Sequence, residues 1–162
     1  MKYLKQFLTV LFLCCLPVIV FGQTETQNKD RESVALLIDK LFDGMREGDS
    51  SKVSSVFHSD VTLFTSYTNK EGEKKINKGE LNNFLKAVGT PHEEIWDEKI
   101  WNTKVMIDDG IAHVWTDYSF YVGDNFSHCG VDAFNLIRDP DKGWLIVSLM
   151  DTRRKEGCET KQ

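Results

Sequence analysis

Apolar side chains recur at spacings of three and four residues along the first half of the chain, which is the period of an amphipathic helix. Between Arg31 and Gly48 the repeat comprises Val34, Leu37, Ile38, Leu41, Phe42 and Met45. Gly48 is typical of a helix end. A short second helix is expected through Val53, Val56 and Phe57, capped by Asp49 or Ser50, and a third over residues 78–88, with Leu81, Phe84, Leu85 and Val88 on its apolar side.

The second half of the chain has the pattern of strands separated by turns. Residues 60–67 already predict a strand, and a charged turn follows over residues 69–75. After Pro91, four β-rich runs cover residues 95–107, 111–122, 126–138 and 144–152, separated by the turn sequences "DDG", "GDN" and "DPDKG". Helices followed by consecutive hairpins predict an α+β fold, in which the helices pack on one face of a curved antiparallel sheet.

The N-terminus has a different pattern, that of a secretory signal peptide. Lys2 and Lys5 precede an almost purely apolar run over residues 7–21, and the small residue Gly22 follows. A run of about 15 residues is shorter than the roughly 20 that a membrane span needs, so a retained transmembrane helix is the weaker interpretation. We expect cleavage after Gly22 and a secreted or periplasmic protein. A disordered leader (23–30), one domain (31–158) and a short tail (159–162) would then follow.

Removal of residues 1–22 would make the chain more acidic. The full sequence has 20 Lys and Arg against 25 Asp and Glu, and loss of Lys2 and Lys5 leaves 18 against 25, a net charge of −7. Acidic charge without a basic cluster argues against nucleic-acid and anionic-membrane partners. The sequence also contains no P-loop, no dinucleotide-binding glycine pattern and no nucleophilic serine elbow, so no cofactor is predicted.

The cysteines divide into two pairs. Cys14 and Cys15 belong to the predicted signal peptide, whereas Cys129 and Cys158 remain in the exported part. An even pair in an oxidising compartment favours a disulfide, and the hairpin at "DPDKG" would place Cys129 opposite about residue 152 or 153, within reach of Cys158. Two free cysteines, or a reactive thiol, are the alternatives. The chain has no CxxC motif and no His/Cys ligand spacing typical of a zinc site, so no metal site is predicted.

Residues 111–154, "IAHVWTDYSFYVGDNFSHCGVDAFNLIRDPDKGWLIVSLMDTRR", carry a resemblance to a known family. With "SHCG", "DAF", "GW" and "DTRR" in this order, the segment resembles the putative lumazine-binding-like branch of the nuclear transport factor 2-like superfamily. The resemblance covers residues 30–158. It implies the cone-shaped α+β fold (a cystatin-like roll) shared with ketosteroid isomerases and polyketide cyclases, a secreted bacterial protein, and a homodimer. It implies no particular activity, because this superfamily contains enzymes, binding proteins and non-catalytic modules.

The hairpin over residues 111–138 contains the candidate site. A two-residue turn at Gly123 and Asp124 would pair His128 with Ser119, and Asp132 with Trp115. Because side chains alternate, one face would then carry His113, Trp115, Asp117, Ser119, Tyr121, Phe126, His128, Asp132 and Phe134. The other would be a packing face with Ala112, Val114, Tyr118, Phe120, Val122, Cys129, Val131 and Ala133. The mixed face is either the solvated side of a half-exposed sheet or the wall of a pocket.

If the mixed face lines a pocket, Trp115 and Phe134 would contact a ligand, and Asp117, His128 and Asp132 are the candidate catalytic groups. A carboxylate in an apolar pocket gains basicity, and a neighbouring histidine can relay its proton. The favoured function is binding of a small apolar or aromatic molecule, which requires no catalytic activity. The alternatives are a proton-transferring isomerase, dehydratase or cyclase, and a homodimeric protein-interaction module. A carboxylate buried in the pocket would favour the enzyme, and a pocket filled by Trp and Phe side chains would favour the interaction module.

Overall fold

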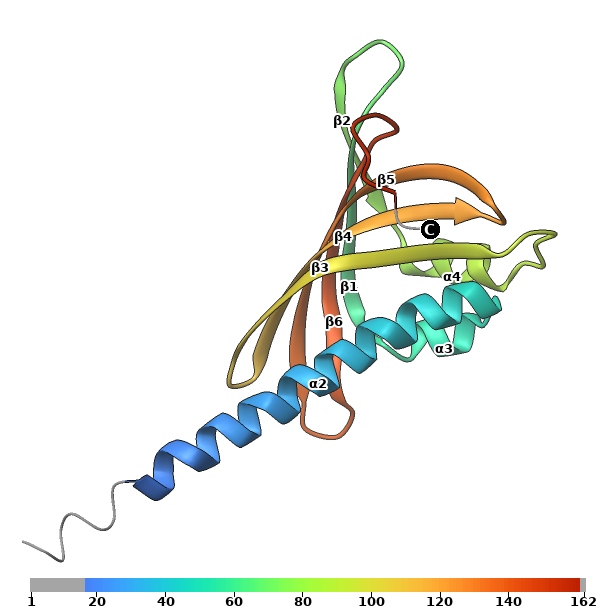
Figure 1. Cartoon of the computed structure of the whole chain (residues 1–162). Coiled ribbons are helices and arrows are strands. Elements are labelled where there is room, and N and C mark those ends of the chain that lie inside the picture. Colours follow the sequence, from blue (N-terminus) through green and yellow to red (C-terminus); the bar gives the residue numbers. More distant parts are fainter. Residues whose placement is uncertain (1–16, 161–162) are drawn as a thin grey trace, which may run out of the picture.

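The computed structural model describes residues 17–160, and their side chains from residue 25 onward. In chain order the elements are α2 (Pro17–Glu47), α3 (Ser50–Ser54), β1 (Phe57–Thr68), β2 (Lys74–Gly79), α4 (Leu81–Gly89), β3 (Trp96–Asp108), β4 (Ile111–Val122), β5 (Asn125–Asp139) and β6 (Gly143–Arg153). The strands form one curved sheet, and the helices lie inside its curve (Figure 1). The predicted α+β fold is therefore confirmed.

The sheet has the strand order β2-β1-β6-β5-β4-β3. The strands β3 to β6 form the three consecutive hairpins that the turn sequences predicted. The first strand, β1, lies beside the last one and runs parallel to it, so that the sheet is mixed rather than purely antiparallel. The register shifts once within each of the pairs β3–β4, β4–β5 and β5–β6. Such irregularities bend strands, and they allow this sheet to curve around the helices.

The C-terminal half of α2 forms the centre of the core. Its predicted apolar stripe is buried, with Val34, Ile38, Leu41 and Phe42 at most 3% exposed. The ring of Phe42 meets the ring of Phe134 on β5 edge-on, at 6.3 Å between ring centres. The helix ends at Gly48, whose φ of 67° suits glycine, and Asp49 caps α3 by accepting hydrogen bonds from two backbone N–H groups.

The segment over residues 23–30, expected to be a disordered leader, belongs to α2 in the structure. This part of the helix projects beyond the sheet (Figure 1), and its residues 25–29 are exposed. Its support is local, since Lys29 pairs with Glu25 one turn earlier, at 3.2 Å. Residues 1–16 of the expected signal peptide lie outside the described part of the chain, and cleavage after Gly22 stays a prediction. No helix among the described residues is long and apolar enough to cross a membrane.

A second difference from the sequence-based prediction concerns residues 74–79. They form β2, which pairs with residues 63–68 of β1, where the sequence suggested a turn and the start of a helix. The strand lies at an edge of the sheet, and residues 74–78 are all exposed. Even Ile76 is 78% exposed. The usual alternation of buried and exposed residues is therefore missing, and lysines are typical of such an edge strand.

The β4–β5 hairpin departs from its predicted register by one residue. The two-residue turn at Gly123 and Asp124 is correct, because Val122 pairs with Asn125. A bulge at Ser127 then shifts the pairing, which becomes His128 with Phe120, Gly130 with Tyr118 and Asp132 with Thr116. The predicted pairings of His128 with Ser119 and of Asp132 with Trp115 were therefore wrong. As a consequence, the even-numbered side chains of both strands share the concave face.

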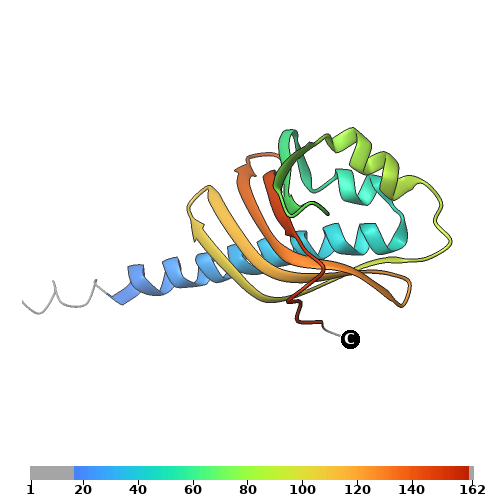
Figure 2. The same ribbon diagram turned by 90° about the horizontal axis from the view of Figure 1, so that it is seen from above.

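The disulfide between Cys129 and Cys158 is confirmed, with an S–S distance of 2.11 Å. Cys129 also exchanges two backbone hydrogen bonds with Arg154, each of 2.9 Å, close to the predicted partner residue. The segment after β6 thus folds back over the outer face of the sheet, where Ser119 Oγ donates to the carbonyl of Glu159 at 3.0 Å. Figure 2 shows this segment on the side of the sheet away from α3 and α4.

Candidate functional site

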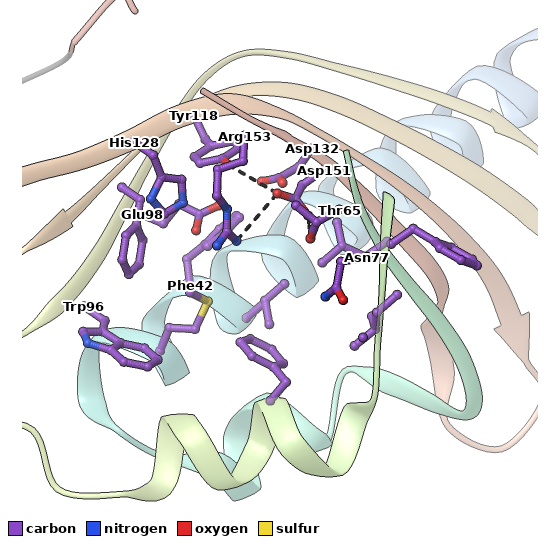
Figure 3. A pocket seen from close by; sticks show the side chains of 18 of the residues that line it. Phe42, Thr65, Asn77, Trp96, Glu98, Tyr118, His128, Asp132, Asp151 and Arg153 are labelled. Carbon is purple, nitrogen blue, oxygen red and sulfur yellow. Dashed lines mark hydrogen bonds and ion pairs between the residues drawn. The ribbon is translucent and has the colours of Figure 1, made fainter. Parts of the chain in front are cut away.

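A cavity of about 610 Å³ lies between the concave face of the sheet and the helices α2 and α4. Its walls are largely apolar and include Phe42, Met45, Phe84, Trp96, Phe120 and Leu149. Figure 3 shows polar side chains gathered at one end, under the sheet, with Phe42 and Trp96 further along the cavity. The arrangement of an apolar chamber with polar groups converging at one place is typical of a small-molecule site.

Three carboxyl groups reach this polar end from different strands. They belong to Glu98 on β3, Asp132 on β5 and Asp151 on β6, and all three line the cavity. Each occupies a position that alternation along its strand assigns to the concave face. Glu98, for example, stands between Trp96 and Ile100, which both pack against the core. The fold therefore places acidic groups where apolar side chains would otherwise complete the core.

Glu98 and Asp132 form a pair of carboxyl groups close enough for a hydrogen bond between them. Asp132 is only 3% exposed, and its Oδ2 atom is buried without a hydrogen-bond partner among the described residues. Burial raises the pKa of Asp132, and the charge of Glu98 raises it further. Burial likewise raises the pKa of Glu98, to about 7. Near neutral pH the pair therefore retains a proton that exposed carboxylates would have lost.

Asp151 differs from this pair because its oxygens have partners. It accepts hydrogen bonds from Thr65 Oγ1 at 2.5 Å and from Tyr118 Oη at 3.4 Å. It also forms an ion pair with Arg153, at 3.7 Å. Burial raises the pKa of Asp151, and these three contacts act against the shift. Asp151 thus serves as an anchor for its neighbours, whereas the pair of Glu98 and Asp132 faces the cavity with unused hydrogen-bonding capacity.

His128 closes the polar end beside these carboxyl groups. Its ring packs against Phe120, at 4.9 Å between ring centres, and against Tyr118, at 5.7 Å. Its Nδ1 shares a hydrogen bond with Ser127 Oγ at 3.0 Å. Burial lowers the pKa of His128 to about 4, with a further contribution from the charges of Arg153 and Lys155. The imidazole is therefore neutral at physiological pH.

The structure separates the residues that the sequence grouped together. His128, Asp132 and Phe134 line the cavity. Trp115 and Asp117 lie on the outer face, so the prediction that all five share a face was wrong. The indole of Trp115 is 47% exposed, and Asp117 accepts a hydrogen bond from Asn102 Nδ2 at 2.9 Å. The cause is the bulge at Ser127, which rotates the faces of β5 relative to β4.

Four site residues escaped the sequence-based prediction: Glu98, Tyr118, Asp151 and Arg153. Glu98 had a signal, since an acidic residue between two apolar ones in an alternating strand lies on the buried face. Asp151 follows Leu149 in the same way. Tyr118 was assigned to the packing face. In the structure this face of β4 forms part of the cavity wall. Among the described residues, no three His, Cys, Asp or Glu side chains are arranged to hold a metal ion.

Comparisons with known proteins agree with this fold. The family model described as putative lumazine-binding matches residues 29–150. No curated protein matches the sequence. Among solved structures, a nuclear transport factor 2-like protein with a cystatin-like fold from Novosphingobium aromaticivorans superposes with a TM-score of 0.69 at 12% identity, over 89% of this chain and 94% of that one.

Two further structures show the same fold. A nuclear transport factor 2-like protein of unknown function from Shewanella baltica has a TM-score of 0.60 at 16% identity, and the match covers 79% of this chain and 96% of that one. A protein from Streptomyces avermitilis described as a putative dehydratase of the same superfamily has a TM-score of 0.58 at 17% identity, over 79% and 98% of the two chains. At these identities the likeness concerns the fold alone.

Proposed function

The chain belongs to the putative lumazine-binding family, and we propose that its cavity binds a small molecule whose apolar body contacts the aromatic walls and whose polar end meets Glu98 and Asp132. One observation carries this proposal: a 610 Å³ cavity with mainly apolar walls contains the buried, unpartnered Oδ2 atom of Asp132. A buried acceptor without a donor costs free energy in the empty protein. A ligand that donates to it would remove this cost.

The size of the cavity favours binding of a small molecule over a protein-interaction module, in which side chains would fill this space. Cavities of roughly 300–1,000 Å³ accommodate drug-sized ligands, so 610 Å³ is ample for a fused-ring molecule. The alternative of a protein-interaction module required Trp and Phe side chains to fill this space, and they line it instead. Homodimerisation stays a prediction, for which the exposed Trp115 and Met150 on the outer face of the sheet provide apolar contact area.

A matched pair of substitutions on β6 tests the binding function. Leu149 lines the cavity, whereas its neighbour Met150 is 46% exposed on the outer face. We expect Leu149→Trp to place a bulky ring in the cavity that obstructs a ligand, and Met150→Trp to leave the cavity unchanged. In thermal-shift assays with a panel of small aromatic and alicyclic compounds, hits for the wild type and for Met150→Trp should be lost in Leu149→Trp. A panel without hits, or hits that persist in Leu149→Trp, would refute the proposal.

A second candidate function is proton transfer, as in an isomerase or a dehydratase. It is favoured by the burial of the acid pair, because a carboxyl group with a pKa near neutrality can both accept and return a proton. In this role the pair of Glu98 and Asp132, acting together, would remove a proton from a carbon next to a carbonyl group and return it at another position. The dehydratase description of the Streptomyces avermitilis protein is compatible with such chemistry.

Deuterium exchange tests this second function without knowledge of the substrate. An enolisable ketone such as 2-tetralone, incubated with the protein in D₂O, should lose its α-proton NMR signals faster than in buffer alone. Asp132→Asn should abolish the acceleration, and Asp117→Asn, on the outer face, should retain it. Exchange at the buffer rate with the wild type, or equal rates for both variants, would leave ligand binding as the function of the cavity.

We also infer that the protein acts outside the cytoplasm. The disulfide of Cys129 and Cys158 suits an oxidising compartment, and the first 22 residues have the pattern of a signal peptide. A secreted or periplasmic location would be supported by an N-terminus at Gln23 in protein isolated from that compartment. An uncleaved chain with free thiols would contradict it.

A further inference from the structure

The charges that surround the cavity are mainly negative. The acidic lining residues are Glu80, Glu98, Asp132 and Asp151, and the basic ones are Lys78 and Arg153. Lys78 and Glu80 are exposed, and Arg153 pairs with Asp151. His128 is held neutral by its burial. Among the lining residues Arg153 is the cation near Glu98 and Asp132, and its charge lowers the pKa of both carboxyl groups. Arg153 already pairs with Asp151, so three carboxyl groups meet a single cation at this end of the cavity.

We propose that the polar end of the ligand is an organic cation, either a protonated amine or an amidine-like group with adjacent N–H donors, which binds between Glu98 and Asp132. This inference rests on the proposed binding function and names the class of its ligand. Two N–H groups of one amidinium fit two carboxylate acceptors, and one of these donors would satisfy Oδ2 of Asp132.

The aromatic walls support a cation over an anion. Trp96 and Phe120 line the cavity together, with their rings edge-on at 6.1 Å between centres, and aromatic faces attract organic cations. An anion would instead have to approach the three carboxyl groups at the polar end of the cavity. A metal ion fits less well than an organic cation, since the described residues provide no cluster of three metal-ligating side chains.

Cation binding would be linked to the proton that the pair retains. The charged and titratable groups around the pair are Asp97 from β3, Tyr118 from β4, His128 from β5, and Asp151 and Arg153 from β6. The lining residues of α2 and α4 carry no titratable group. A cation would take the place of the retained proton, so its affinity should rise with pH as the pair ionises. Affinity for an anion or a neutral acceptor would fall over the same range.

Three probes of similar size separate the charge of the ligand from its apolar body: benzamidine, benzoate and benzyl alcohol. Ligand-observed NMR or calorimetry with the full mature chain should show that benzamidine binds at least about tenfold more tightly than the other two, the effect of one hydrogen bond to a charged group. Its affinity should rise about tenfold between pH 5.5 and 7.5, because it competes with one proton. Asp132→Asn should remove this preference, and Asp117→Asn should keep it.

The results distinguish this inference from the function on which it rests. Benzyl alcohol or benzoate binding as tightly as benzamidine would overturn the cation proposal and leave binding in the cavity intact. Failure of all three probes would overturn the cation proposal, and a compound panel without hits would overturn the binding function as well. If Asp132→Asn does not fold, Glu98→Gln provides the same test, and the comparison of the three probes needs no variant.

Discussion

The ring of Tyr118 lies beside Gly130, its cross-strand partner on β5, and its hydroxyl donates to the carbonyl oxygen of Thr152 at 3.0 Å. A methyl group at Gly130 would stand 1.7 Å from that oxygen and 2.7 Å from the ring of Tyr118. Because β6 approaches Gly130 closely, the hydroxyl of Tyr118 can also reach Asp151 at the polar end of the cavity. No other residue type fits at this point of the sheet.

Gly130→Ala should therefore destabilise the fold by about 3 kcal/mol or more, because backbone as well as side-chain atoms must move. Urea unfolding measures this loss. Gly110→Ala is the matched control, since a methyl group there would meet no atom within 4 Å. Equal stability of the two variants would show that β5 and β6 are further apart than described.

The disulfide should contribute about 3–4 kcal/mol to stability, as expected for a closed loop of this length. It joins residues 29 positions apart. The double variant Cys129→Ser/Cys158→Ser should unfold at a correspondingly lower urea concentration. A reductant should lower the midpoint of the wild type and leave the variant unchanged. A midpoint of the wild type that stays constant once mass spectrometry shows complete reduction would contradict this prediction.

The acid pair should make the protein less stable as pH rises. Glu98 ionises near 4.5 in the unfolded chain and near 7 in the folded one, so the folded state binds the proton more tightly. Its contribution to stability is fully present below pH 4.5 and is lost as pH rises through about 7. Glu98→Gln should therefore be more stable than the wild type at pH 8, by about 1–3 kcal/mol, and the difference should shrink towards pH 4. Urea unfolding at both pH values tests the sign.

His128 should remain neutral well below the usual range of histidine. Its pKa of about 4 would appear in an NMR titration of the ¹⁵N-labelled folded protein. The same residue should titrate near 6.5 in the urea-unfolded chain. A folded-state pKa lowered in this way means that His128 reduces stability as pH falls from about 6.5 through about 4. Titration of the folded protein near pH 6.5 would show that the ring is solvated rather than packed between Tyr118 and Phe120.

The sequence predicted the elements better than it predicted the site. The stripe of α2 and the turns of the long hairpins follow directly from periodicity and from residues such as Gly48 and Gly123. The edge strand β2 has no buried face, so its sequence carries no alternation. The bulge at Ser127 has no local signal either, and it decides whether Asp117 or Tyr118 shares the face of His128. A site built on two strands therefore depends on a register that each strand's own pattern leaves open.

Glu98 could have been predicted from its own strand, because it alternates with Trp96 and Ile100. Its partner Asp132 could not be predicted in this way. The strand β4 separates β3 from β5 in the sheet, so contact between Glu98 and Asp132 requires the curvature of the whole sheet. The Cys129–Cys158 disulfide was predictable because a single hairpin, β5–β6, brings the two cysteines together. Pairings within one hairpin could thus be predicted from the sequence. Contacts between side chains of non-adjacent strands on the concave face could not.

Native mass spectrometry of the wild-type protein, purified without added ligand, tests whether the cavity binds a small molecule. The native mass of the wild type should exceed the denatured mass by one small molecule per chain. This excess should persist in Met150→Trp and disappear in Leu149→Trp. An excess retained in Leu149→Trp would place the molecule elsewhere. No excess in the wild type, even after incubation with the compounds of the thermal-shift panel, would contradict the claim that this cavity binds a ligand.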